Sequence, residues 1–123
     1  MESKKKKLLK SAQNLEEALK QYRSHETELN FLTLTKAFEI LIEYLWRELR
    51  MMVEDQGLEA ASPKMAIKQA AKLNLISNPE LWMESLEARN NSVHDYFGIS
   101  EENYSSLAEE LLKLVKKSGN LIS

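Results

Sequence analysis

The 123-residue sequence has no cysteine, only 3 glycines and 2 prolines, and no apolar run of membrane-spanning length. The absence of cysteine excludes disulfide bonds and thiolate metal sites. The scarcity of glycine and proline leaves few points at which a helix must stop, which favours long helices. No segment combines the basic and apolar stretches of a signal peptide, so we expect a cytoplasmic protein without a membrane segment.

An excess of charge of either sign is also missing. The chain carries 17 Lys and Arg against 19 Asp and Glu, and its net charge is +2 over residues 1–50 and −4 over residues 51–123. Proteins that depend on phosphate contacts are usually basic. We therefore expect any RNA contact to be local, brief or assembled between subunits. The basic run Lys4–Lys7 is either a solvated helix end or an arm that contacts RNA.

What the sequence does have is helical periodicity, because apolar side chains recur about every three to four residues along most of the chain. The expected helices cover residues 3–22 and 29–56, followed by three shorter ones that begin at Pro63, at Pro79 and after Ser100. The second helix is apolar around much of its circumference, so it must pack on several neighbours or on another subunit. We expect one all-α domain over residues 1–123, an antiparallel bundle of four to five helices with a long second helix, and a dimer.

The boundaries of these helices carry typical capping residues. Thr27, Ser62, Asn78 and Ser100 have side chains that can accept hydrogen bonds from the first turn of a helix. Gly57 suits the left-handed turn that often ends a helix. These residues predict where four helices begin and where the long second helix ends.

The end of the fourth helix gathers residues that a scaffold does not require: Arg89, Asn90, Asn91, His94 and Tyr96. Histidine, with an ordinary pKa of about 6.5, can take or give a proton during phosphodiester cleavage. Arginine is always charged and can stabilise a phosphorane-like transition state. The stretch predicts a metal-independent site in which Arg89 and His94 are catalytic, while Asn90 and Asn91 orient the substrate.

Neither a metal nor a cofactor is expected. The stretch offers a single candidate histidine ligand, His94, with no carboxylate cluster around it. The other histidine begins the run His25-Glu26-Thr27-Glu28, which lacks the second histidine of a zinc-protease motif. A loop or helix-cap role is therefore expected for that run.

Helical geometry limits how Arg89 and His94 can cooperate. In one continuous helix, positions five apart are separated by about 140° around the axis and about 7.5 Å along it, so the two side chains point apart. Either the helix ends near Asn90 and Asn91, which favour caps and turns, or a second copy of the chain supplies the complementary residue. The bare spacing is also compatible with a structural salt bridge or a hydrogen-bonded histidine.

Taken with its setting, the motif resembles the HEPN superfamily, specifically the small helical nucleotidyltransferase substrate-binding proteins. The signature is an arginine, four residues, a histidine, one residue and a tyrosine, here Arg89, His94 and Tyr96. The likeness covers most of the chain. Its other matching positions are Phe38-Glu39, Glu43-Tyr44-Leu45-Trp46, Leu49, Gly57, Ser62-Pro63, Ala70 and Trp82.

This resemblance implies a helical bundle that dimerises with the signature facing its mate. It implies that Arg89 and His94 form a metal-independent ribonuclease site, as in the toxin members of the superfamily. It also implies a separately encoded minimal nucleotidyltransferase as partner. In toxin–antitoxin pairs, that partner adenylylates the tyrosine matching Tyr96 and silences the nuclease.

Three functions are therefore weighed. The first is a dimeric endoribonuclease toxin that acts on RNA and is restrained by modification of Tyr96. The second is a non-catalytic subunit that completes the substrate site of a nucleotidyltransferase and binds a nucleotide, which the acidic C-terminal half favours. The third is a helical interaction protein in which Arg89 and His94 serve no chemistry.

Overall fold

The computed structural model describes residues 2–94 and 100–117, with side chains described for residues 6–90 and 100–117. These residues form five α-helices and no strand, which confirms the expected all-α class. The helices are α1 (Glu2–Ser24), α2 (Glu28–Asp55), α3 (Pro63–Lys72), α4 (Pro79–His94) and α5 (Glu101–Lys117). None of the described helices is both long and apolar enough to span a membrane.

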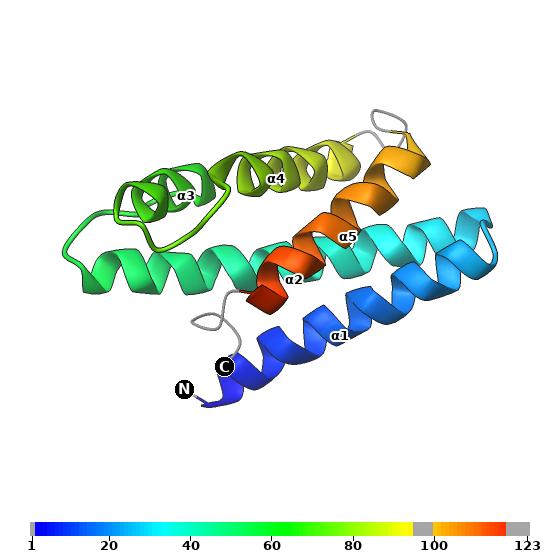
Figure 1. Ribbon diagram of the computed structural model, residues 1–123, viewed down its shortest axis with the longest axis horizontal. Coiled ribbons are helices and arrows are strands. Elements are labelled where there is room, and N and C mark those ends of the chain that lie inside the picture. The colour runs from blue at the N-terminus through cyan, green and yellow to red at the C-terminus, as the bar shows by residue number, and fades with distance from the viewer. Residues whose placement is uncertain (1, 95–99, 118–123) are drawn as a thin grey trace.

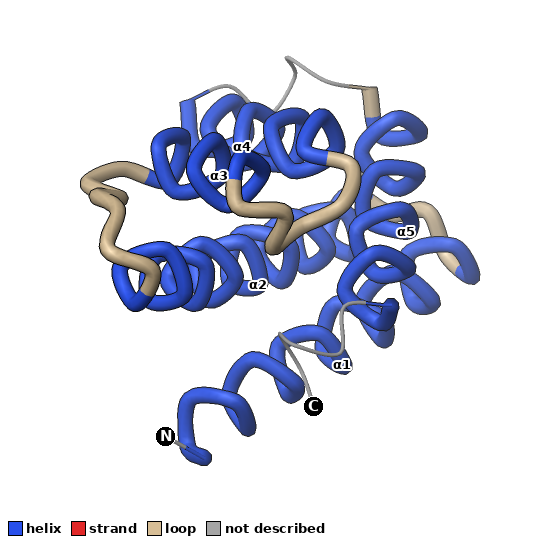
Figure 2. The backbone as a smooth tube through the Cα atoms, turned by 60° about the vertical axis from the view of Figure 1, so that its left-hand side comes forward, coloured by secondary structure: helices blue, strands red, loops and turns tan. Residues whose placement is uncertain are grey.

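The long helix α2 is the centre of the bundle, and all four other helices contact it. Figures 1 and 2 show α1 along one side of α2, the α3–α4 pair along the other, and α5 crossing toward α1. Neighbours within one chain cover much of the apolar surface of α2, while Leu32 and Ile40 stay 40% and 41% exposed. The fully buried residues of α2 are Leu34, Phe38, Leu41, Leu45, Leu49 and Val53.

Aromatic side chains join α1, α2 and α5 at one end of the bundle. The Phe31 ring lies 5.7 Å from that of Tyr22 and 5.6 Å from that of Tyr104, centroid to centroid. Phe38 contacts Tyr104 from the next turns of α2, at 5.0 Å. Such tilted and edge-on pairs are favourable geometries for aromatic rings. Tyr22 and Tyr104 are buried core residues, and Trp82 is likewise buried.

The predicted caps are confirmed. Thr27, Ser62, Asn78 and Ser100 each accept a hydrogen bond from the backbone N–H three residues on, at 3.1–3.2 Å. Each bond satisfies a donor that the first turn of a helix leaves unpaired. Gly57 follows α2 with a φ of +86°, the left-handed conformation that glycine adopts without strain.

Candidate functional site

Arg89 is positioned by the buried face of α4. Trp82, Leu86 and Ala88 on this helix are buried against the core, and α4 contacts α2, α3 and α5. Arg89 lies at the border of that face, and its side chain is 30% exposed. The apolar residues thus fix the rotation of α4 and leave the guanidinium between the core and solvent, where a ligand can reach it.

A carboxylate on α2 holds this guanidinium. Arg89 Nη2 lies 3.1 Å from Glu43 Oε2, while Glu43 Oε1 lies 3.0 Å from Nη2 of Arg47 on the same helix. Arg89 Nη1 donates a hydrogen bond to Asn90 Oδ1 at 3.2 Å. Charge-assisted bonds between arginine and carboxylate are strong and directional. Glu43 therefore orients Arg89 and ties α4 to the middle of α2.

Of the two alternatives for this helix, the structure contradicts the first: α4 does not end at Asn90 and Asn91. It continues through both residues to His94. The apolar contacts of α4 and the uninterrupted backbone hydrogen bonds outweigh the tendency of the Asn-Asn pair to form a turn. Arg89 and His94 are therefore five positions apart on one continuous helix, about 140° apart around its axis.

The rest of the predicted site falls outside the described residues. The side chains of Asn91 and His94 are not described, and neither is Tyr96. Among the predicted site residues, the structure shows a contact between Arg89 and Asn90. The roles assigned to Arg89, Asn90, Asn91, His94 and Tyr96 stay predictions.

Glu43 and Arg47 are site neighbours that sequence reasoning did not identify. An arginine on an apolar helical stripe indicates that a partner exists. It does not say which of the many glutamates is that partner, because Glu43 is 46 residues away in sequence. The spacing of Glu43 and Arg47, four apart on a predicted helix, is a signal for a local ion pair but not for the contact with Arg89.

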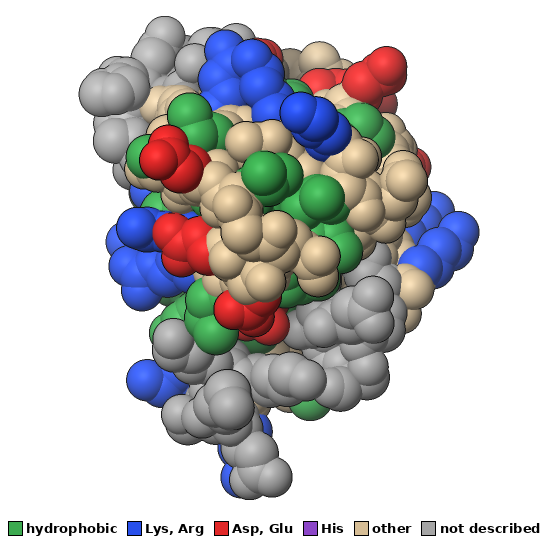
Figure 3. Space-filling model, turned by 90° about the vertical axis from the view of Figure 1, so that its left-hand side faces the viewer, with side chains coloured by type: hydrophobic (Ala, Val, Ile, Leu, Met, Phe, Trp, Pro, Cys, Tyr) green, Lys and Arg blue, Asp and Glu red, His purple; other side chains and the backbone are tan. Residues whose placement is uncertain are grey.

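The surface beside α4 is acidic on the side of α5. Glu80, Glu84 and Glu87 of α4, together with Glu110 of α5, line a hollow of about 630 Å³ that has no Lys or Arg among its lining residues. Figure 3 shows one end of the molecule, on which basic, acidic and hydrophobic side chains are intermixed instead of forming a continuous basic surface. A polyanion is therefore repelled from the α4–α5 groove, and any RNA contact must be local.

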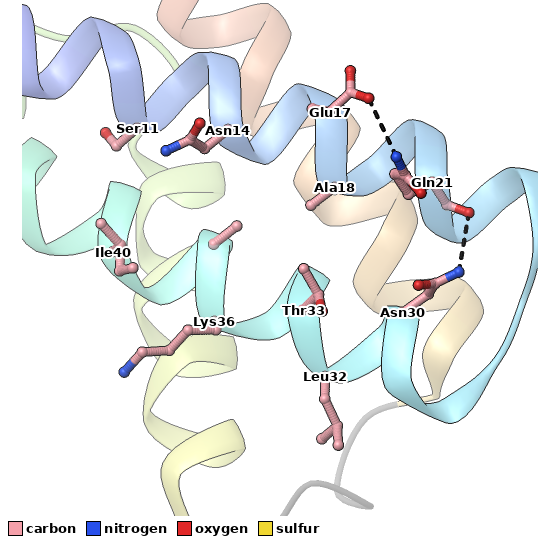
Figure 4. Close-up of a pocket in the computed structure, with 11 residues that line it drawn as sticks. Ser11, Asn14, Glu17, Ala18, Gln21, Asn30, Leu32, Thr33, Lys36 and Ile40 are labelled. Atoms are coloured by element: carbon pink, nitrogen blue, oxygen red, sulfur yellow. Dashed lines mark hydrogen bonds between the residues drawn. The ribbon is translucent and has the colours of Figure 1, made fainter.

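A large hollow elsewhere on the molecule does not contain the candidate site. It measures about 750 Å³ and lies between α1 and α2, where Asn14, Gln21 and Asn30 line it together with Thr33 and Lys36 (Figure 4). Arg89 and Asn90 do not line this hollow. Its volume therefore does not identify it as the site that the motif predicts.

A family model described as nucleotidyltransferase substrate binding protein like matches residues 4–120. Curated proteins yield no match to the chain. The match spans all five helices, including the whole of α4 and the candidate site.

Proposed function

The chain belongs to the family of nucleotidyltransferase substrate binding protein-like proteins, and we propose that it is a metal-independent endoribonuclease paired with a separately encoded minimal nucleotidyltransferase. The observation that supports this proposal is the state of Arg89. Its guanidinium is held by Glu43 of another helix, yet its side chain is 30% exposed. An oriented and accessible guanidinium suits the stabilisation of charge on a phosphate.

The proposed reaction needs only groups of the protein and the RNA. The ribose 2′-oxygen attacks the adjacent phosphorus while the bond from phosphorus to the 5′-oxygen breaks, which yields a 2′,3′-cyclic phosphate and a 5′-hydroxyl. His94 accepts the proton of the 2′-hydroxyl and then donates it to the leaving 5′-oxygen. Arg89 stabilises the charge on the phosphate, while Asn90 and Asn91 orient it.

We infer that the site is shared by two copies of the chain. On a continuous α4, positions 89 and 94 are separated by about 140° around the helix axis. A symmetric dimer can oppose Arg89 of one copy to His94 of the other, so that each dimer holds two shared sites of one arginine and one histidine. The homodimer is part of the proposal.

Regulation follows from the partner that the family description names. A nucleotidyltransferase can transfer the adenylyl group of ATP to the hydroxyl of Tyr96, forming a tyrosyl phosphodiester and releasing pyrophosphate. The added phosphate places a negative charge beside the motif and obstructs access of RNA. Incubation with the partner and ATP is expected to add the mass of one adenylyl group to the wild type but not to Tyr96→Phe.

The nuclease is tested with purified protein and a labelled oligoribonucleotide in the presence of EDTA. Wild type is expected to cleave and leave a cyclic phosphate, while Arg89→Ala and His94→Ala lower the rate at least about a hundredfold. Arg50→Ala and His25→Ala are matched controls, since both residues are exposed and lie outside the motif. Cleavage that survives His94→Ala contradicts catalysis at this site.

A second function is favoured by the family description and by the glutamates along α4. In it, the chain is a non-catalytic subunit that completes the substrate site of a nucleotidyltransferase. Its expected signature is co-purification with the transferase, nucleotide affinity in the complex alone, and no effect of unpartnered expression on growth. Growth arrest that depends on His94 selects the nuclease instead.

A further inference from the structure

A second, smaller hollow adjoins Arg89 on the side of α4 that faces α3. It measures about 330 Å³, at the low end of the range of about 300–1,000 Å³ typical of small-molecule sites. The N-cap and first turn of α3 form one wall, and residues 83–90 of α4 form the other. The lining residues are Ser62, Pro63, Lys64, Met83, Leu86, Glu87, Arg89 and Asn90.

We propose that this hollow binds one nucleoside phosphate unit, the nucleotide of an RNA strand next to the phosphate that Arg89 contacts. The proposal rests on the function proposed above and extends it by a second binding residue, Lys64. Free nucleotides carry the same chemistry, so the two sources are separated by experiment below.

The lining of the hollow has the two parts that a nucleotide requires. Pro63 of α3, with Met83 and Leu86 of α4, gives the hollow an apolar lining, in which Leu86 is buried and the other two are half-buried. A polarisable thioether beside proline and leucine suits the flat face of a base. Lys64 and Arg89 supply positive charge on opposite walls, the arrangement that holds a phosphate between them.

Lys64 is available for such a contact. Its side chain is exposed, and within the described part of the chain no salt bridge joins it to a carboxylate. Arg89, by contrast, is held in place by Glu43. Arg89 is thus oriented before the ligand binds, whereas Lys64 can move to contact the ligand.

The two flanks of α4 differ in charge, which decides the direction that a strand can take from Arg89. On the α5 side, four glutamates and no cation line the hollow. On the α3 side, Glu87 is the one carboxylate, and it lines the hollow together with Lys64 and Arg89. Repulsion disfavours the first direction, so the strand is expected to leave Arg89 along α3.

Binding is measured with an oligoribonucleotide carrying 2′-O-methyl groups, which cannot be cleaved because the attacking hydroxyl is blocked. Lys64→Ala is expected to weaken binding and to lower the slope of log affinity against log salt by about 0.7, the value for one lost phosphate contact on a single strand. Lys68→Ala is the matched control. It removes an exposed lysine one turn along α3, outside the lining of the hollow.

The apolar lining of the hollow is tested by Met83→Gln, which keeps the side-chain length. This variant is expected to weaken binding several-fold without changing the salt slope, since no charge is removed. A thermal melt of each variant verifies that the fold is retained. In a parallel experiment, adenosine monophosphate replaces the oligonucleotide. If adenosine monophosphate binds and the oligonucleotide does not, the hollow is a site for a free nucleotide and the RNA proposal is overturned.

The remaining outcomes also decide the proposal. Equal affinities and slopes for Lys64→Ala and Lys68→Ala overturn it, as does a wild type that binds neither probe. If binding depends on Lys64 but the wild type does not cleave unmodified RNA, the binding site in the hollow is supported and the proposed nuclease activity is contradicted. Failure of the binding site and failure of the catalytic proposal are therefore distinguishable.

Discussion

Glu43 makes the contact on which the geometry of the candidate site depends. Its carboxylate bridges Arg89 of α4 and Arg47 of its own helix, one oxygen to each guanidinium. A carboxylate shared by two arginines is less able to neutralise either one completely. Arg89 therefore keeps a fixed orientation and part of its positive potential, which is what binding a phosphate requires.

Glu43→Gln tests whether this carboxylate orients Arg89. The amide keeps a similar shape but has one carbonyl oxygen and no charge, so it cannot serve both arginines. RNA cleavage is expected to slow by about tenfold through a lower kcat, because Arg89 is less often in position. Initial rates at saturating oligoribonucleotide measure this.

Glu54→Gln is the control for that variant. Glu54 pairs with Arg50 on the same helix, at 3.3 Å, and both side chains are nearly half exposed. Its loss is expected to leave the rate unchanged, since exposed pairs contribute little. A Glu43→Gln protein that cleaves faster than wild type would mean that Glu43 restrains Arg89 instead of orienting it.

At the scale of elements, polar contacts attach α5 to α1. Arg23 pairs with Glu109, Lys116 pairs with Glu16, and the Tyr22 hydroxyl donates to Glu101 Oε1 at 2.7 Å. The first two pairs are exposed and salt-screened. Tyr22 is buried, and its bond joins the end of α1 to the first turn of α5. The bond therefore fixes the start of α5 against α1.

Tyr22→Phe tests that attachment. Burial, followed by the hydrogen bond to the Glu101 carboxylate, raises the pKa of Tyr22 to about 12. The folded state thus holds the phenol proton more tightly than the unfolded chain, whose tyrosine has a pKa of about 10. The stabilisation is fully present below pH about 10 and is lost as the pH rises from about 10 to about 12.

Urea denaturation measures the effect. Near neutral pH, Tyr22→Phe is expected to lower the free energy of unfolding by about 1 kcal/mol, the net value of a typical hydrogen bond. The gap from wild type should close as the pH rises to about 12. Tyr44→Phe is the control, because no described residue accepts a hydrogen bond from its hydroxyl. A gap that is constant across this pH range would exclude the hydrogen bond as its cause.

At the scale of the whole molecule, the continuity of α4 means that the proposed catalysis depends on how two copies of the chain assemble. Positions 89 and 94 of one chain are about 140° apart around the axis of this helix. A two-fold dimer repeats each contact, so a pairing of Arg89 with the partner's His94 occurs twice. Inactive variants are therefore expected to complement one another.

Mixing Arg89→Ala with His94→Ala checks this. In a mixed dimer one of the two shared sites keeps both wild-type residues, so after subunit exchange activity is expected to recover to about a quarter of wild type. Analytical ultracentrifugation verifies that dimers form. Each variant alone, taken through the same exchange procedure, serves as the control. Absence of recovery in verified mixed dimers contradicts a site made of one arginine and its partner's histidine.

The sequence by itself determined the helices and their boundaries. Apolar periodicity and capping are local properties, so Thr27, Ser62 and Gly57 marked helix boundaries that the structure confirms. The motif residues Arg89 and His94 were also evident from sequence, because their identities and spacing are local.

The tertiary structure alone decided which elements meet. Packing of α4 against three helices keeps it helical through Asn90 and Asn91, where local preference favoured an end. It also selected Glu43 as the partner of Arg89 and placed Lys64 across a hollow from it. These contacts join residues far apart in sequence, and their energies depend on burial and mutual orientation, which a linear pattern does not contain.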